Sequence, residues 1–114
     1  MDKPQALVGM HDAFKSSLDT LLRSEGYGVT LVDSVAEMLE RLNSSGPYRL
    51  CFMDANLGSP SEETYEPARR VYEIITSRSE KMGFMAFTGS PTLVNTMRTA
   101  GFPGSNKTSA PFAL

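Results

Sequence analysis

The stretch that decides the fold runs from residue 50 to residue 58 and reads LCFMDANLG. Its first four residues are apolar and follow the turn residues Gly46-Pro47, a pattern typical of a short strand that is buried on both faces. The strand ends on a carboxylate, Asp54, and a polar loop follows at once. Because ligands of open parallel α/β sheets bind beyond the carboxyl ends of the strands, a reacting side chain is useful at this position. A carboxylate here could equally turn the chain or cap a helix.

The composition is that of one soluble globular domain. The 114 residues suffice for a single core, and their 40% hydrophobic and 21% charged content is ordinary for such a domain. A net charge of −2 argues against nucleic acid as a partner. The single cysteine, Cys51, excludes an internal disulfide and a cysteine-cluster metal site, and we interpret it as a small buried hydrophobe. No apolar run reaches the about 18 residues of a membrane span and no secretory segment follows Met1, so we expect a cytoplasmic protein without a membrane partner.

Strand and helix patterns alternate along the chain. Helical spacing of apolar residues predicts four helices, which begin at the caps Asp12 and Ser34, at a first turn with Pro67, and at the cap Ser90. This alternation predicts an α/β architecture, a parallel sheet of order 2-1-3-4-5 with helices on both faces, formed by residues 1–114 as one domain. Besides the strand that ends at Asp54, the predicted strands are Ala6–Val8 ending near Gly9, Val29–Val32, Gly83–Phe87 ending on Thr88, and a weaker one through Phe102–Ser105.

Three of these strands lead into residues of reactive types, namely Asp54, Thr88 and Lys107. Because the carboxyl ends of parallel strands share one edge of a sheet, we expect the three side chains to lie near one another. An aspartate can accept a phosphoryl group and become an acyl phosphate. A lysine and a hydroxyl can neutralise the charge on the phosphoryl oxygens. The shared edge, more than any single residue, therefore favours a functional role for Asp54, and phosphoryl transfer is one chemistry that these residue types allow.

Over nearly its whole length the sequence resembles the receiver domain of two-component response regulators. The resemblance is carried by five motifs in the family's order and spacing: Ala6-Leu7-Val8, LLRSEGY over residues 21–27, Phe52-Met53-Asp54, Phe87-Thr88-Gly89 and Ala100-Gly101-Phe102. It implies a flavodoxin-like, doubly wound five-stranded fold. It also implies a role in signal transduction by phosphorelay, in which the chain is a phosphoprotein and no enzyme beyond catalysing its own phosphorylation.

The resemblance assigns roles to individual residues. It implies that Asp54 accepts a phosphoryl group from a histidine kinase or a phosphotransfer protein. Mg²⁺ would be held partly by Asp54 and the backbone carbonyl of Asn56, while Thr88 and Lys107 would contact the phosphoryl oxygens. The output would pass to an effector domain or to a separate partner protein, and the sequence identifies neither of them.

The first departure from the family concerns the metal. Receiver domains carry an acidic pair after the first strand, but counting places that pair at Gly9-Met10 or, with a one-residue slip, at Met10-His11. Asp12 is the only acid nearby and competes with its capping role. Because Mg²⁺ prefers several oxygen ligands, we expect weak binding, which aspartates at both Met10 and His11 should strengthen. His11 could be a soft-metal ligand or a proton shuttle, but a solvent-facing loop histidine fits a lone histidine better.

The C-terminal part departs from the family as well. Thr108 follows Lys107 where the family has proline, and an alternative register over Ala110–Phe112 would remove the lysine from the site. The family's aromatic residue on the fifth strand is missing, because Gly104-Ser105 occupies that position. The sequence stops at Leu114, so the fifth helix is expected to be missing or truncated. This leaves apolar surface that favours self-association or coverage by residues 108–114.

Three functions compete at this point. The first is a phosphoacceptor receiver domain that acts as a switch through Asp54. The second is a phosphorylation-independent pseudo-receiver, which keeps the fold as a protein-interaction module. The third, a small hydrolase with Asp54 as nucleophile, is disfavoured because no second carboxylate follows Asp54 at a spacing suited to acid–base work.

Overall fold

The computed structural model describes residues 3–11, 13–44, 46–59, 61–78 and 81–107. The described strands are β1 (Gln5–Gly9), β2 (Gly28–Val32), β3 (Leu50–Asp54), β4 (Gly83–Thr88) and β5 (Gly104–Asn106). The described helices are α1 (Phe14–Ser24), α2 (Val35–Ser44), α3 (Glu66–Thr76) and α4 (Pro91–Thr99). The strands form one parallel sheet of order β2-β1-β3-β4-β5, which confirms the predicted doubly wound α/β fold.

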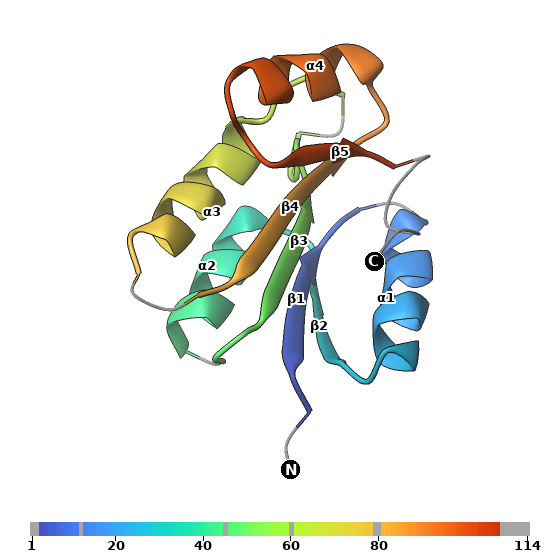
Figure 1. Ribbon diagram of the computed structural model, residues 1–114, viewed down its shortest axis with the longest axis vertical. Helices are drawn as coiled ribbons and strands as arrows, with labels where there is room; N and C mark the ends of the chain where they lie inside the picture. Colours follow the sequence, from blue (N-terminus) through green and yellow to red (C-terminus); the bar gives the residue numbers. More distant parts are fainter. Residues whose placement is uncertain (1–2, 12, 45, 60, 79–80, 108–114) are drawn as a thin grey trace.

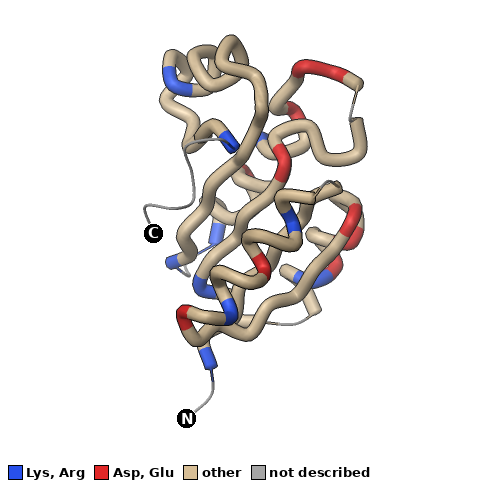
Figure 2. The backbone as a smooth tube through the Cα atoms, turned by 90° about the vertical axis from the view of Figure 1, so that its right-hand side faces the viewer, with Lys and Arg blue, Asp and Glu red and all other residues tan. Residues whose placement is uncertain are grey.

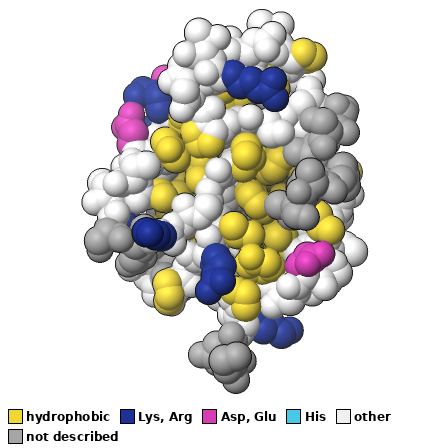
Figure 3. Space-filling model, viewed as in Figure 1, with side chains coloured by type: hydrophobic (Ala, Val, Ile, Leu, Met, Phe, Trp, Pro, Cys, Tyr) yellow, Lys and Arg dark blue, Asp and Glu magenta, His cyan; other side chains and the backbone are white. Residues whose placement is uncertain are grey.

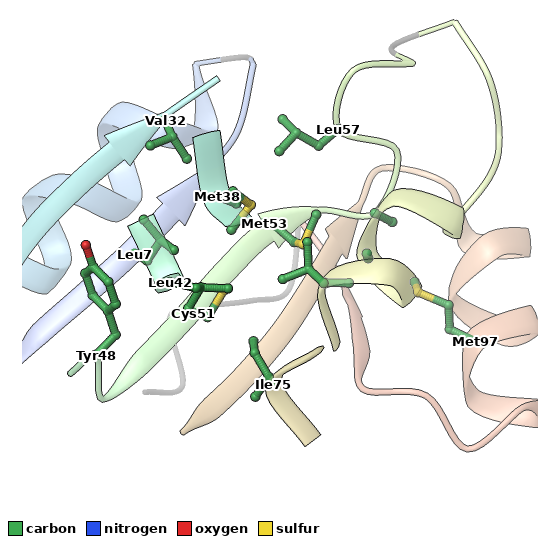
Figure 4. Packing of buried hydrophobic residues seen from close by; sticks show 14 of the residues in the cluster. Leu7, Val32, Met38, Leu42, Tyr48, Cys51, Met53, Leu57, Ile75 and Met97 are labelled. Carbon is green, nitrogen blue, oxygen red and sulfur yellow. The ribbon is translucent and has the colours of Figure 1, made fainter. Parts of the chain in front are cut away.

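The helices cover the two faces of the sheet unequally. Helix α1 lies on one side, whereas α2 and α3 lie on the other (Figure 1). The larger cluster of buried residues joins the sheet to α2, α3 and α4 and includes Met38, Val71 and Met97 (Figure 4). The smaller cluster joins the sheet to α1 through Leu18 and Leu22. The sheet is therefore sandwiched, as alternating strands and helices require.

Local signals in the sequence account for the helix starts. Ser90 caps α4, because its Oγ accepts a hydrogen bond from the Leu93 N–H at 3.1 Å. Ser34 Oγ likewise accepts from the Glu37 N–H at 3.1 Å at the start of α2. The predicted cap of α1 was wrong, since the capping position is Ala13, which offers no side-chain acceptor. Asp12 lies outside the described residues.

The fifth strand is shorter than predicted. It begins at Gly104, because Phe102 leaves the sheet and packs its ring against Tyr65, Tyr72 and Phe84, with centroids 5.1, 5.1 and 5.9 Å away. An aromatic ring at this position gains more from the neighbouring rings than from a strand edge. The predicted fifth-helix region and the alternative lysine register at 110–112 both lie beyond the described part of the chain.

Some apolar surface stays uncovered. Figure 3 shows hydrophobic side chains gathered near the middle of the face seen in Figure 1. Leu31 is 42% exposed on β2, which forms one edge of the sheet. Among the helices that the structure describes, none is long and apolar enough to cross a membrane.

Candidate functional site

Asp54 is the last residue of β3 and lies at the carboxyl edge of the sheet, where β1 and β4 flank its strand. Its side chain is fully buried, and it is the only charged side chain with that degree of burial among the described residues. A buried carboxylate is costly unless hydrogen bonds and opposite charges compensate it. The groups that compensate Asp54 therefore define the site.

One carboxylate oxygen of Asp54 is held by His11. The backbone N–H of His11 donates a hydrogen bond to Oδ2 at 2.9 Å, and Nδ1 of the same residue lies 3.0 Å from this oxygen. Since a carboxylate can only accept, a hydrogen on Nδ1 would allow the ring to donate to the same oxygen. Because the peptide group and the ring of one residue point at the same atom, Oδ2 is fixed by the loop that follows β1.

The other oxygen is held by Lys107. The ammonium Nζ lies 2.7 Å from Asp54 Oδ1, and the lysine side chain is 17% exposed. The contact is close enough for an ion pair, but Oδ1 accepts no well-aligned hydrogen bond from the described residues. A lysine ammonium rotates freely on its stem, so the ion pair does not depend on one donor angle. The two oxygens thus differ, since Oδ2 accepts a backbone hydrogen bond and Oδ1 lies beside a cation.

A cluster of aromatic rings lies beside Asp54 and Lys107. Phe87 is the direct neighbour of Asp54 across the β3–β4 ladder. The rings of Phe14 and Phe52 pack on Phe87 with centroids 5.3 and 5.6 Å away, and Lys107 Nζ stands 5.9 Å from the Phe14 ring centroid. Burial of Asp54 strengthens its attraction to Lys107 and makes the loss of either Lys107 or His11 expensive.

Thr88 ends the neighbouring strand β4, one residue beyond the partner of Asp54. Its hydroxyl accepts a hydrogen bond from the Ser90 N–H at 3.1 Å, and its carbonyl accepts from the Lys107 N–H at 2.9 Å. Thr88 is therefore adjacent to the site, but its hydroxyl is turned toward the start of α4. The structure brings Lys107 to Asp54, whereas the Thr88 side chain would have to rotate for its hydroxyl to face the site.

The residues implied for Mg²⁺ do not fit that ion well. The Asn56 carbonyl accepts from the Ser59 N–H at 2.7 Å, and the Asn56 amide donates to the Glu62 carbonyl at 2.8 Å, so this residue is used to shape its own loop. Met10, in the position of the acidic pair, is completely buried in the core. Among the described residues, a divalent ion here would have one carboxylate, already engaged by His11 and Lys107, while Asp12 lies outside the described part of the chain.

Other carboxylates at this edge are engaged elsewhere. Asp33, which follows β2, pairs with Lys15 at 3.0 Å. Glu63 accepts a hydrogen bond from Ser90 Oγ, within the acidic loop between β3 and α3 that Figure 2 displays. Within the described ranges, no three histidine, cysteine or acidic side chains come together as metal ligands.

The position of the missing aromatic residue is filled from another element. A Cβ atom on Gly104 would lie 2.5 Å from Met97 Cε and 2.6 Å from Met97 Sδ. Met97 is itself fully buried. The Met97 side chain on α4 thus occupies the space that an aromatic side chain on β5 would enter, and glycine at position 104 leaves room for it.

His11 is the functional residue that the sequence interpretation missed. We expected a solvent-facing loop histidine; the residue does lie exposed in a loop, but its side chain is 25% exposed and its Nδ1 lies 3.0 Å from Asp54 Oδ2. The signal that could have revealed it was its place, because the loop after β1 must adjoin the end of β3 in a sheet of this order. The acidic pair of the family could be aligned with Gly9-Met10 or with Met10-His11. Only the second alignment includes the residue that contacts Asp54.

Two further features do not belong to this site. A cavity of about 640 Å³ opens at the opposite, amino edge and is lined by Lys3, Arg49 and Lys81, far from the buried carboxylate. Cys51 is fully buried, and this burial raises the pKa of its thiol to about 12. A thiol that stays protonated is no nucleophile, as expected for a core hydrophobe.

Comparisons with known proteins add evidence on the fold. No family model matches the chain, and a comparison with curated proteins finds no match either. Among solved structures, a similar chain is described as the yeast Spc42 trimeric coiled coil, amino acids 181–211, fused to another structure. The two chains are 20% identical, with a TM-score of 0.65, and the similarity covers 97% of this chain and 72% of that one. At this identity, the likeness shows the fold alone.

Proposed function

We propose that this chain is a receiver-type signalling domain that accepts a phosphoryl group on Asp54. The observation that carries the proposal is the meeting of a buried strand-end carboxylate with a lysine ammonium 2.7 Å away, beside the strand that ends at Thr88. Phosphoryl transfer needs a positioned nucleophile and positive or donor groups for the phosphoryl oxygens, and little other chemistry from the protein. This edge of the sheet supplies both.

The transfer step would proceed as follows. An oxygen of Asp54 forms a bond to phosphorus while the P–N bond of a phosphohistidine donor breaks. The bonding pair stays on the donor nitrogen, and a ring already protonated on its other nitrogen leaves as neutral imidazole. Lys107 moves from the carboxylate to the transferred phosphoryl group, which its flexible four-carbon stem permits. The Thr88 hydroxyl exchanges the Ser90 N–H for a phosphoryl oxygen.

The partners follow from this chemistry. The donor would be a histidine kinase or a phosphotransfer protein, and the readout would be a rearrangement around Thr88 and the start of α4, where Ser90 and Glu63 are already linked. An effector domain or a separate protein would sense that rearrangement. The chain would be an acceptor and no enzyme toward other molecules.

A second candidate is a pseudo-receiver that works without phosphorylation. The observation that favours it is the complete burial of Asp54, with both oxygens already engaged by His11 and Lys107. In this case the ion pairs are purely structural, and the surface of the domain would carry the function as a protein-interaction module.

Phosphoramidate, a small phosphoryl donor with a P–N bond, separates the two candidates. Intact-mass measurement should show one added phosphoryl group on the wild type and none on Asp54→Asn. The matched control is Asp33→Asn, which removes a carboxylate from the same edge of the sheet and should be labelled like the wild type. Absence of labelling from the folded wild type, with and without Mg²⁺, would reject the phosphoacceptor and favour the pseudo-receiver.

A further inference from the structure

His11 provides Asp54 with what a bound cation would otherwise provide. It comes from the loop after β1, its backbone N–H donates to Oδ2 at 2.9 Å, and its Nδ1 lies 3.0 Å from the same oxygen. An acidic side chain at this position would repel Asp54, and a cation would be needed between the two carboxylates. With histidine there, the two side chains attract each other directly.

We propose that His11 replaces the divalent metal at this site, so that the domain holds and uses Asp54 without Mg²⁺. Three observations support this inference. Oδ2, the oxygen that faces the β1 loop, is already coordinated by His11. The Asn56 carbonyl is engaged with the Ser59 N–H. Asp33 pairs with Lys15 and does not reach the site.

The same geometry selects the oxygen that reacts. Oδ2 accepts the His11 backbone N–H and has the His11 ring beside it, whereas Oδ1 lies next to the ammonium of Lys107 and accepts no well-aligned hydrogen bond from the described chain. Oδ1 is therefore the oxygen whose lone pair becomes available when Lys107 moves onto an incoming phosphoryl group. His11 keeps the carboxylate oriented during the reaction by retaining Oδ2, which makes it a positioning residue. This part of the inference rests on the proposed phosphoryl acceptance.

The first test measures metal binding and does not depend on phosphorylation. Backbone amide signals of residues 11 and 54 are followed by NMR while MgCl₂ is added to the wild type and to His11→Asp. The wild-type signals should stay in place at millimolar Mg²⁺, while those of His11→Asp should shift and saturate. Asn95→Asp, which adds one carboxylate on the exposed side of α4, serves as the matched control and should behave like the wild type. Saturable shifts in the wild type at the same concentrations would overturn the inference.

The second test uses phosphoramidate with either EDTA or MgCl₂. The wild type should be labelled at the same rate in both. His11→Asp should lose at least about tenfold in EDTA and recover in Mg²⁺, since it has exchanged a built-in donor for a metal requirement. His11→Asn, which keeps an N–H near the position of Nδ1, should remain independent of metal. Labelling of the wild type only in Mg²⁺ would contradict the inference. If the wild type is never labelled, the proposed function fails, and the NMR titration alone decides whether His11 replaces the metal.

Discussion

Asp54 is the residue whose environment does most to determine what this molecule can do. Its side chain is fully buried. Two residues from opposite ends of the chain, His11 and Lys107, compensate the cost of burying its carboxylate. Removal of one partner leaves a buried carboxylate with less compensation, which costs more than the pair contributes net. The site is thus coupled to the stability of the fold.

This coupling predicts the behaviour of Lys107→Met. The variant should lose about 2 kcal/mol of unfolding free energy, below the roughly 3–5 kcal/mol typical of breaking a fully buried pair, because His11 still donates and Lys107 is partly exposed. Urea denaturation measures the loss. Adding Asp54→Asn to Lys107→Met should restore part of it, since the double variant has no orphaned charge. Equal losses in the single and double variants would contradict the coupling.

Cys51 gives a prediction about pH. Burial raises the pKa of its thiol from 9.0 to about 12, so the unfolded chain loses this proton before the folded one does. The contribution of Cys51 to stability is therefore complete below pH 9 and is lost as the pH rises toward 12, by about 1.4 kcal/mol per pH unit in that window. Cys51→Ala has no thiol to ionise. Above pH 9 the unfolding free energy of the wild type should therefore fall relative to that of this variant. A difference that stays constant up to pH 10.5, about 1.5 units above 9.0, would show that the thiol is not protected.

Some residues of this site could be predicted from the sequence and others could not. Asp54 and Lys107 could be expected to meet, because each follows a strand whose place in the sheet the alternation predicts. His11 could not be recognised in the same way, since one histidine in a loop has no partner in the sequence pattern. Its role appears only when the loop after β1 lies beside the end of β3, 43 residues further along.

Among the elements, α4 and β5 are adjusted to each other. Met97 on α4 fills the space in front of Gly104 on β5, so that neither residue can be changed alone without loss. Sequence periodicity predicted the two elements but not this pairing, because which side chain faces a strand depends on the packing of the whole helix. The late start of β5 depends on tertiary packing as well, since Phe102 packs into the aromatic cluster.

Gly104→Tyr tests this fit. The ring would collide with Met97, and we expect a loss of about 2–3 kcal/mol in unfolding free energy from overpacking. Met97→Ala combined with Gly104→Tyr should recover much of that loss by opening space for the ring. Thermal unfolding followed by circular dichroism compares the variants. A combined variant that is no more stable than Gly104→Tyr would show that Met97 is not what excludes the ring.

For the whole molecule, the prediction of self-association concerns uncovered apolar surface. Leu31 on the edge strand β2 is the large hydrophobic residue that stands out, with 42% of its surface exposed. Edge strands and exposed apolar side chains both favour contact with a second copy. Leu31→Lys should therefore weaken any concentration-dependent association in sedimentation velocity, while Asn95→Lys on α4 should not. A wild type that sediments as a monomer at every concentration would contradict self-association and leave the alternative, coverage of the apolar surface by residues 108–114.

The order of the strands also determines when the charge on Asp54 is neutralised as the chain is made. β1 pairs with both β2 and β3, so the residues that bring His11 to Asp54 all lie within the first 54 of the sequence. Lys107 is synthesised only after β4, α4 and β5. The groups beside the two oxygens of Asp54 are therefore made at different times, the His11 loop early and the lysine cation only after the last described strand.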